Sequence, residues 1–235
     1  PDSIMLFRMG DFYETFEDDA VIASKILGIT LTKRANGAAS SVLLAGFPYH
    51  SLDQYLHKLL KAGHRVAICE QVEDPKKAKG IVKREVVEVL SPGTALSEKY
   101  LDGRENNYLA SIIFEKEIVG ISILDHSTGE FHCGEWSVSG FENVIRQFHV
   151  KEILISESQA PLCKSRLNDS QLFLSTFPDW VADRDTGYGI LTDHFKTNSL
   201  KGFGIENLNA GICAAGAVLN YVGQNFQNRI KHITS

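Results

Sequence analysis

Residues 4–28 read IMLFRMGDFYETFEDDAVIASKILG, and this stretch decides the fold class. An apolar run over residues 4–9 ends at Gly10. Residues 17–27 then repeat apolar side chains at helical spacing, with acids in the first turn and Gly28 directly after the last. The stretch therefore predicts a strand, a turn and a helix, which is the beginning of an α/β domain.

The rest of the first half alternates between short β-branched strands and a second helix. Ser51 is a good N-cap for that helix, because Gln54 three residues later completes a capping box. An uncharged loop of small residues is predicted over 35–41. The order βαββαββ indicates a mixed-sheet α/β domain over residues 1–98. The elements predicted after the first helix are strands at 29–32, 42–45, 65–72 and 81–90, and a helix from Ser51 to Gly63.

The second half begins after a polar, turn-rich linker over residues 99–107. Three strands separated by tight breaks form an antiparallel meander, and helical and strand patterns then alternate. The order βββαβαβα resembles the ribonuclease-H-like fold, and we assign it to residues 108–203. The last apolar segment, 207–221, is rich in Ala and Gly, and its packing partners are expected outside the chain. We therefore assign 204–235 to the start of an all-α core or lever domain.

Composition favours two soluble domains. Of the 235 residues, 43% are hydrophobic and 23% are charged, so each half can bury a core. No membrane span or signal peptide is recognisable, and the four cysteines have no metal-binding spacing, which predicts a cytoplasmic protein with reduced thiols. The net charge of -5 argues against a dedicated nucleic-acid binder, but nine residues over 76–84 contain five bases and no acid.

Several motifs resemble one protein family. Residues 7–14 (FRMGDFYE) are similar to the signature of the mismatch-binding domain of the MutS family of DNA mismatch-repair proteins, in which Phe-x-Glu follows Gly-Asp. Residues 125–131 (DHSTGEF) are similar to the hairpin of that family's connector domain. The resemblance implies the front part of such a protein, with these two domains and without the ATPase. Further matches follow in the expected order at 31–34 (LTKR), 45–50 (AGFPYH), 66–71 (VAICEQ) and 91–94 (SPGT).

The resemblance implies that Phe12 and Glu14 bind the mismatch. If the chain is extended after Gly10, these two side chains share one face while Tyr13 turns into the domain. An apolar wedge can enter the minor groove between base steps, and the unstacking cost is lowest where pairing is defective. Glu14 repels phosphates but can accept a hydrogen bond from an unpaired base, so we expect it to weaken binding to intact duplex most. The alternative is that these aromatic side chains belong to the core.

Seven basic residues are candidates for contact with the DNA backbone. Each has two interpretations, as a solvated surface charge or as a ligand for phosphate oxygens. In the second case, replacing a basic residue should weaken binding to every DNA about equally and reduce the salt dependence of that binding. The candidates are Lys33, Arg34, Lys76, Lys77, Lys79, Lys83 and Arg84.

Two other functions compete with DNA recognition. Asp125 lies on a predicted strand where ribonuclease-H-like nucleases carry a metal-binding acid, although two-metal hydrolysis needs further converging carboxylates. The acidic second half also suits a protein-interaction module. No P-loop motif occurs, so we expect no catalytic residue, metal or cofactor in this chain. The resemblance implies that the full-length protein is an ATPase that uses ATP and Mg²⁺, works as a homodimer without a membrane, and binds MutL through the connector domain.

Overall fold

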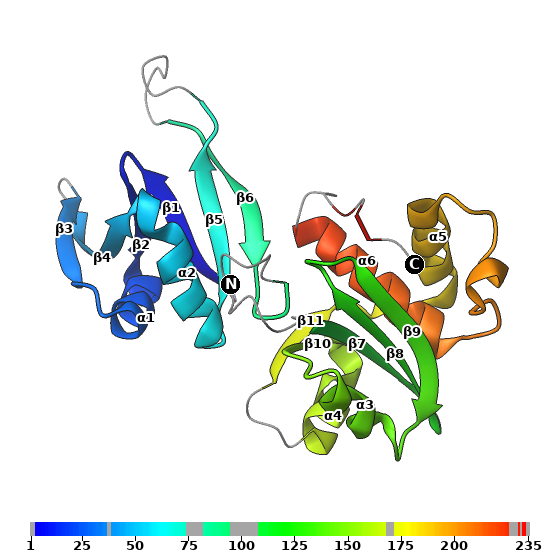
Figure 1. The fold of residues 1–235 in the computed structure, drawn as a ribbon. Helices are drawn as coiled ribbons and strands as arrows, with labels where there is room; N and C mark the ends of the chain where they lie inside the picture. The colour runs from blue at the N-terminus through cyan, green and yellow to red at the C-terminus, as the bar shows by residue number, and fades with distance from the viewer. Residues whose placement is uncertain are drawn as a thin grey trace. The chain divides into compact units, whose positions relative to one another are not determined.

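The computed structural model describes residues 3–36, 39–73, 82–94, 108–167, 172–225, 230 and 232–233. The chain divides into two compact units, Pro1–Asp102 and Gly103–Ser235, and each unit has its own sheet (Figure 1). The predicted linker over 99–107 lies outside the described residues. Both units combine helices with a mixed sheet, so the predicted α/β class is confirmed.

The first unit is built on a six-stranded sheet in the order β3-β4-β2-β1-β5-β6. Only the β1–β5 pair is parallel, and the other four pairs are antiparallel. The predicted helix over 17–27 is confirmed as α1, and Gly28 ends it in the left-handed conformation at φ 68°. The elements are β1 (Ser3–Met9), β2 (Phe12–Phe16), α1 (Glu17–Leu27), β3 (Thr32–Asn36), β4 (Ala39–Pro48), α2 (Leu52–Lys61), β5 (Arg65–Gln71) and β6 (Arg84–Leu90).

Four predictions for the first unit are wrong. The strand predicted at 29–32 is displaced, since β3 begins at Thr32 and residues 29–31 belong to no strand. The order is ββαββαββ because the short strand β2 runs directly into α1, with no break to separate them in the sequence. The predicted loop at 35–41 is mostly strand, since β3 and β4 form a hairpin held by backbone hydrogen bonds that do not depend on the side chains. Ser51 makes no side-chain cap, because it ends a 3-10 turn at φ -97° and ψ 8° instead of the extended conformation that an N-cap needs.

The second unit is built on a five-stranded sheet in the order β11-β10-β7-β8-β9. Strands β7, β8 and β9 are antiparallel neighbours, whereas β10 runs parallel to β7 and to β11. The predicted order βββαβαβα is confirmed, and a further helix follows it. The elements are β7 (Tyr108–Glu115), β8 (Ile118–Asp125), β9 (Glu130–Ser137), α3 (Phe141–Gln147), β10 (Glu152–Ser156), α4 (Ala160–Arg166), β11 (Phe173–Phe177), α5 (Arg184–Phe195) and α6 (Ala210–Asn225).

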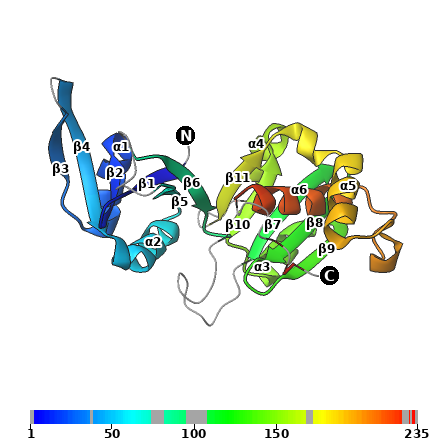
Figure 2. The same ribbon diagram turned by 90° about the horizontal axis from the view of Figure 1, so that it is seen from above.

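Helix α6 belongs to the second unit, which corrects the assignment of residues 204–235 to a further helical domain. It packs against β7, β8 and α5, and its partners are therefore inside the chain (Figure 2). A Cβ atom on Gly120 of β8 would lie 2.0 Å from the carbonyl carbon of Ala210, so the glycine permits this close approach. Apolar side chains of α3 and α4 pack on the opposite face of the sheet.

Candidate nucleic-acid interface

A tight hairpin between β1 and β2 presents one aromatic side chain to solvent. Gly10 opens the two-residue turn at φ 62°, a conformation that suits glycine in such turns, and Met9 pairs with Phe12 across it. Side chains along β2 alternate between the two faces of the sheet, so Phe12 is 47% exposed and Tyr13 is 3% exposed. The predicted division, with Phe12 outward and Tyr13 inward, is what the structure has.

Tyr13 anchors the hairpin in the core. Its ring packs 6.0 Å from that of Phe47, and its hydroxyl donates a hydrogen bond to Glu70 of β5. Burial and the neighbouring carboxylate raise the pKa of Tyr13 well above its usual range, so the hydroxyl stays a donor. The strand that carries Phe12 is therefore fixed from its inner face.

A stack of Arg8 on Tyr49 holds the tip of the hairpin, and the sequence prediction missed it. The guanidinium carbon of Arg8 lies 3.8 Å from the ring centroid of Tyr49, and its Nε donates to the Gly10 carbonyl at 2.5 Å. The Tyr49 amide donates to the carbonyl of Asp11 at 2.9 Å. Arg8 and Tyr49 each belong to a motif that resembles the MutS family. This resemblance was the only feature of the sequence that could have pointed to the contact between them.

Glu14 lies two residues after Phe12 and is only 18% exposed at its side chain. It pairs in register with Gly46 of β4, where a Cβ atom would come within 3.4 Å of the Glu14 Cγ. Its Oε2 atom lies 3.5 Å from Nη1 of Arg34 on β3. Phe12 and Glu14 also line one pocket of about 450 Å³, together with Leu44, Gly46 and residues 28–30 and 32.

The basic candidates occupy different environments. Lys33 and Arg34 are exposed on β3. Lys83 forms an ion pair with Glu85 at 2.6 Å, which raises the pKa of Lys83, whereas Arg84 is half-buried and its Nε donates to the Arg8 carbonyl at 2.9 Å. This bond joins β6 to the strand that leads into the hairpin. Lys76, Lys77 and Lys79 lie outside the described residues.

Asp125, the acid on which the nuclease alternative depends, closes the turn after β8. It is fully buried, and its Oδ1 accepts from the Ser127 amide at 2.8 Å, the Ser127 hydroxyl at 2.6 Å and the Thr128 amide at 3.4 Å. Among the residues that the structure describes, no three His, Cys, Asp or Glu side chains are grouped so that they would hold a metal ion. The arrangement gives this acid a structural role.

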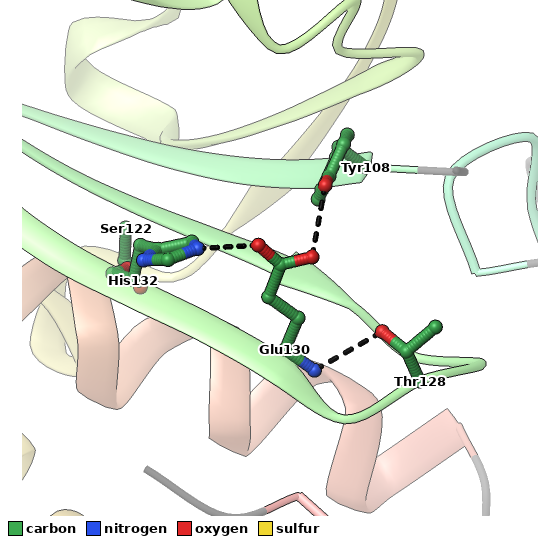
Figure 3. Close-up of polar contacts among 5 residues, drawn as sticks. All are labelled: Tyr108, Ser122, Thr128, Glu130 and His132. Carbon is green, nitrogen blue, oxygen red and sulfur yellow. Dashed lines mark hydrogen bonds and ion pairs between the residues drawn. The ribbon is translucent and has the colours of Figure 1, made fainter. Parts of the chain in front are cut away.

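Glu130 and Glu152 also interact with side chains of the second unit. Glu130 accepts from the Tyr108 hydroxyl at 2.9 Å and lies 2.7 Å from Nε2 of His132 (Figure 3). These two contacts lower the pKa of Glu130. Glu152 is fully buried and accepts from the hydroxyls of Ser175 at 2.6 Å and Tyr221 at 2.8 Å. Glu130 therefore links β9 to β7, and Glu152 links β10 to β11 and α6.

The comparisons with known proteins agree with one family over both units. Residues 1–99 match the family model for MutS domain I, and residues 107–234 match the model for MutS domain II. In the part of the chain that the structure describes, no helix has the length and apolar character to cross a membrane.

Full-length relatives extend this match. The DNA mismatch repair protein MutS of Flavobacterium psychrophilum is 51% identical over 235 residues, which are 100% of this chain and 27% of that protein. The protein of the same name from Porphyromonas gingivalis is 49% identical over 238 residues, 100% of this chain and 26% of its own length. The chain thus spans about a quarter of these relatives. Two family models and relatives at about half identity agree, and the chain therefore belongs to the MutS family as its domains I and II.

Proposed function

We propose that this chain recognises mismatched or unpaired bases in duplex DNA, with Phe12 as an apolar wedge and Glu14 as a hydrogen-bond acceptor, both entering from the minor groove. The observation that carries the proposal is an exposed aromatic ring at the tip of a hairpin whose next residue, Tyr13, is locked in the core. A large apolar side chain held in water at a fixed position is suited to insertion between bases.

The energetics favour defective base pairs. Unstacking a base step costs a few kcal/mol, and the cost is lowest where pairing is already broken. Arg8 and Tyr13 hold the hairpin in place before DNA arrives, so little ordering is required on binding. The same wedge then binds a mismatched step more tightly than a matched one.

Glu14 supports discrimination by a second route. Its carboxylate repels phosphates, and in intact duplex the base N–H groups are already used in pairing. A mismatched or unpaired base offers such a donor. Lys33, Arg34 and the basic stretch over 76–84 are proposed to contact phosphates of the DNA backbone.

For the whole protein, we propose an ATPase that uses ATP and Mg²⁺ and acts as a homodimer. The second unit is the connector that relays mismatch binding to the ATPase and receives MutL. The support is that the relatives, named for DNA mismatch repair, are about four times as long as this chain. A cytoplasmic location is part of the proposal. If a protein without residues 108–200 still recruits MutL, the proposed role of the connector is wrong.

The test is the affinity of the whole protein for a G·T heteroduplex and the matched homoduplex at one salt concentration. Phe12→Ala should lower heteroduplex affinity about tenfold or more and leave weak homoduplex binding, because aromatic contact with a base contributes about 1–3 kcal/mol. Trp180→Ala removes another exposed aromatic ring, from the second unit, and should leave both affinities unchanged. Survival of the heteroduplex preference in folded Phe12→Ala would overturn the wedge.

A further inference from the structure

Glu14 and Arg34 form an ion pair in which the two side chains differ in their exposure to solvent. Oε2 of Glu14 is buried and makes no hydrogen bond to any residue that the structure describes, and Nη1 of Arg34 lies 3.5 Å away. The Glu14 side chain is 18% exposed, whereas that of Arg34 is 61% exposed. The acid is therefore fixed in the sheet, and the arginine reaches it from the surface.

This asymmetry determines which partner can leave. A buried carboxylate oxygen without compensation is unfavourable, so Glu14 needs a donor or a cation nearby. Arg34 itself lies mostly in water, and an arginine in water can exchange one anionic partner for another at low cost when Glu14 gains another donor. Phosphate is such a partner, because a guanidinium matches its geometry.

We infer that Arg34 is a specificity-determining residue, and this inference rests on the proposed function. Arg34 becomes free to contact the DNA backbone only when a mismatched base takes its place beside the Glu14 carboxylate. On a mismatch, the base N–H satisfies the carboxylate and Arg34 moves to a phosphate. On intact duplex, no base donor is offered, so Arg34 stays with Glu14 and contributes no backbone contact. The ion pair thus links base recognition to backbone affinity.

Lys33 provides a matched control on the same strand. Lys33 and Arg34 are both exposed, but alternation along β3 places them on opposite faces, and only Arg34 is paired with Glu14. A backbone contact by Lys33 would be independent of the base. Its removal should therefore affect matched and mismatched DNA equally.

The experiment compares Arg34→Gln, Lys33→Gln, Glu14→Gln and the double variant Glu14→Gln/Arg34→Gln in the whole protein. Affinities for a G·T heteroduplex and its homoduplex are measured over a series of salt concentrations. Arg34→Gln should weaken heteroduplex binding at least about threefold more than homoduplex binding. It should also reduce the heteroduplex salt slope by about one while leaving the homoduplex slope unchanged. Lys33→Gln should change both DNAs to the same extent.

The double variant tests the coupling directly. With Gln at position 14 the ion pair is absent, so Arg34 is available to phosphate on both DNAs, and the Arg34→Gln change should then weaken both equally. If Arg34→Gln acts equally on both DNAs while Glu14 is intact, the inference is wrong. Phe12→Ala separates the two proposals, because loss of the heteroduplex preference in that variant supports the wedge whatever Arg34 does. Thermal unfolding of each variant verifies that the fold is retained.

Discussion

Phe12 of the first unit is 47% exposed beside a carboxylate, whereas Asp125 and Glu152 of the second unit are fully buried. Asp125 accepts hydrogen bonds within its own turn, and Glu152 accepts them from β11 and α6. Residue type alone, without the alternation after Gly10 or the resemblance, would place an aromatic residue in a core and acids at the surface. The structure has the reverse. Exposure and hydrogen bonding, more than residue type, separate a candidate binding surface from internal support.

The largest expected effect concerns two phenylalanines of the first unit. Phe47 is 2% exposed and packs against Tyr13 and Tyr55, so Phe47→Ala should lower the free energy of unfolding by about 3–5 kcal/mol. Phe12→Ala removes an exposed ring and should change stability by no more than about 0.5 kcal/mol. Urea denaturation measures both. Similar losses in the two variants would mean that Phe12 belongs to the core.

The second prediction concerns the packing of α6 on β8. A Cβ atom at Gly120 would lie 2.0 Å from backbone atoms of Ala210, so Gly120→Ala should force the helix outward and cost about 2–3 kcal/mol. Gly189 of α5 has no neighbouring atom within 4 Å of such a Cβ, and Gly189→Ala should be neutral or stabilising by up to about 1 kcal/mol. Equal denaturation midpoints for the two variants would contradict the close approach of α6.

How far the sequence predicts this fold differs between elements. The α1 helix was predicted at its exact bounds because acids in its first turn and Gly28 at its end mark both termini. Strands on both sides of the loop at 35–41 were predicted, but the extent of the β3–β4 hairpin was missed, because pairing near its turn is made by the backbone and leaves no apolar alternation in the sequence. The packing of α6 was also missed, since a helix rich in Ala and Gly does not reveal which sheet face will approach it.

The candidate site was predictable only in part. Alternation after Gly10 predicts that Phe12 and Glu14 share a face and that Tyr13 lies inside. The ion pair with Arg34 joins residues twenty positions apart through the pairing of three strands. Such a contact depends on tertiary register, which local patterns do not contain.

The third prediction tests whether titratable groups of the second unit are structural. Burial, and then the nearby His232, lower the pKa of His126 to about 4 from an ordinary 6.5. As the pH falls below 6.5, the unfolded chain takes up this proton before the folded chain does, so stability is lost between pH 6.5 and pH 4. The loss from pH 7 to pH 5 should be about 2 kcal/mol.

His126→Gln should remove this part of the pH dependence, measured as the difference in unfolding free energy between pH 7 and pH 5. His149→Asn, at an exposed histidine, should retain it. If His126→Gln leaves the pH dependence as it is in the parent protein, His126 is accessible to protons in the folded state and the buried assignment is wrong.

The smallest effect concerns the hydroxyl that joins α6 to the sheet. Tyr221 donates to the buried carboxylate of Glu152 at 2.8 Å, so Tyr221→Phe removes one donor and should cost about 1 kcal/mol with little change in volume. Tyr188→Phe loses longer, partly exposed contacts of 3.3 Å with Glu206 and should cost less. Because α6 closes one face of the sheet, Tyr221→Phe should also increase hydrogen exchange of the α6 amides relative to those of α3 on the opposite face. If Tyr221→Phe changes the hydrogen-exchange rates of α6 and α3 to the same extent, Glu152 supports β10 and β11 without holding α6.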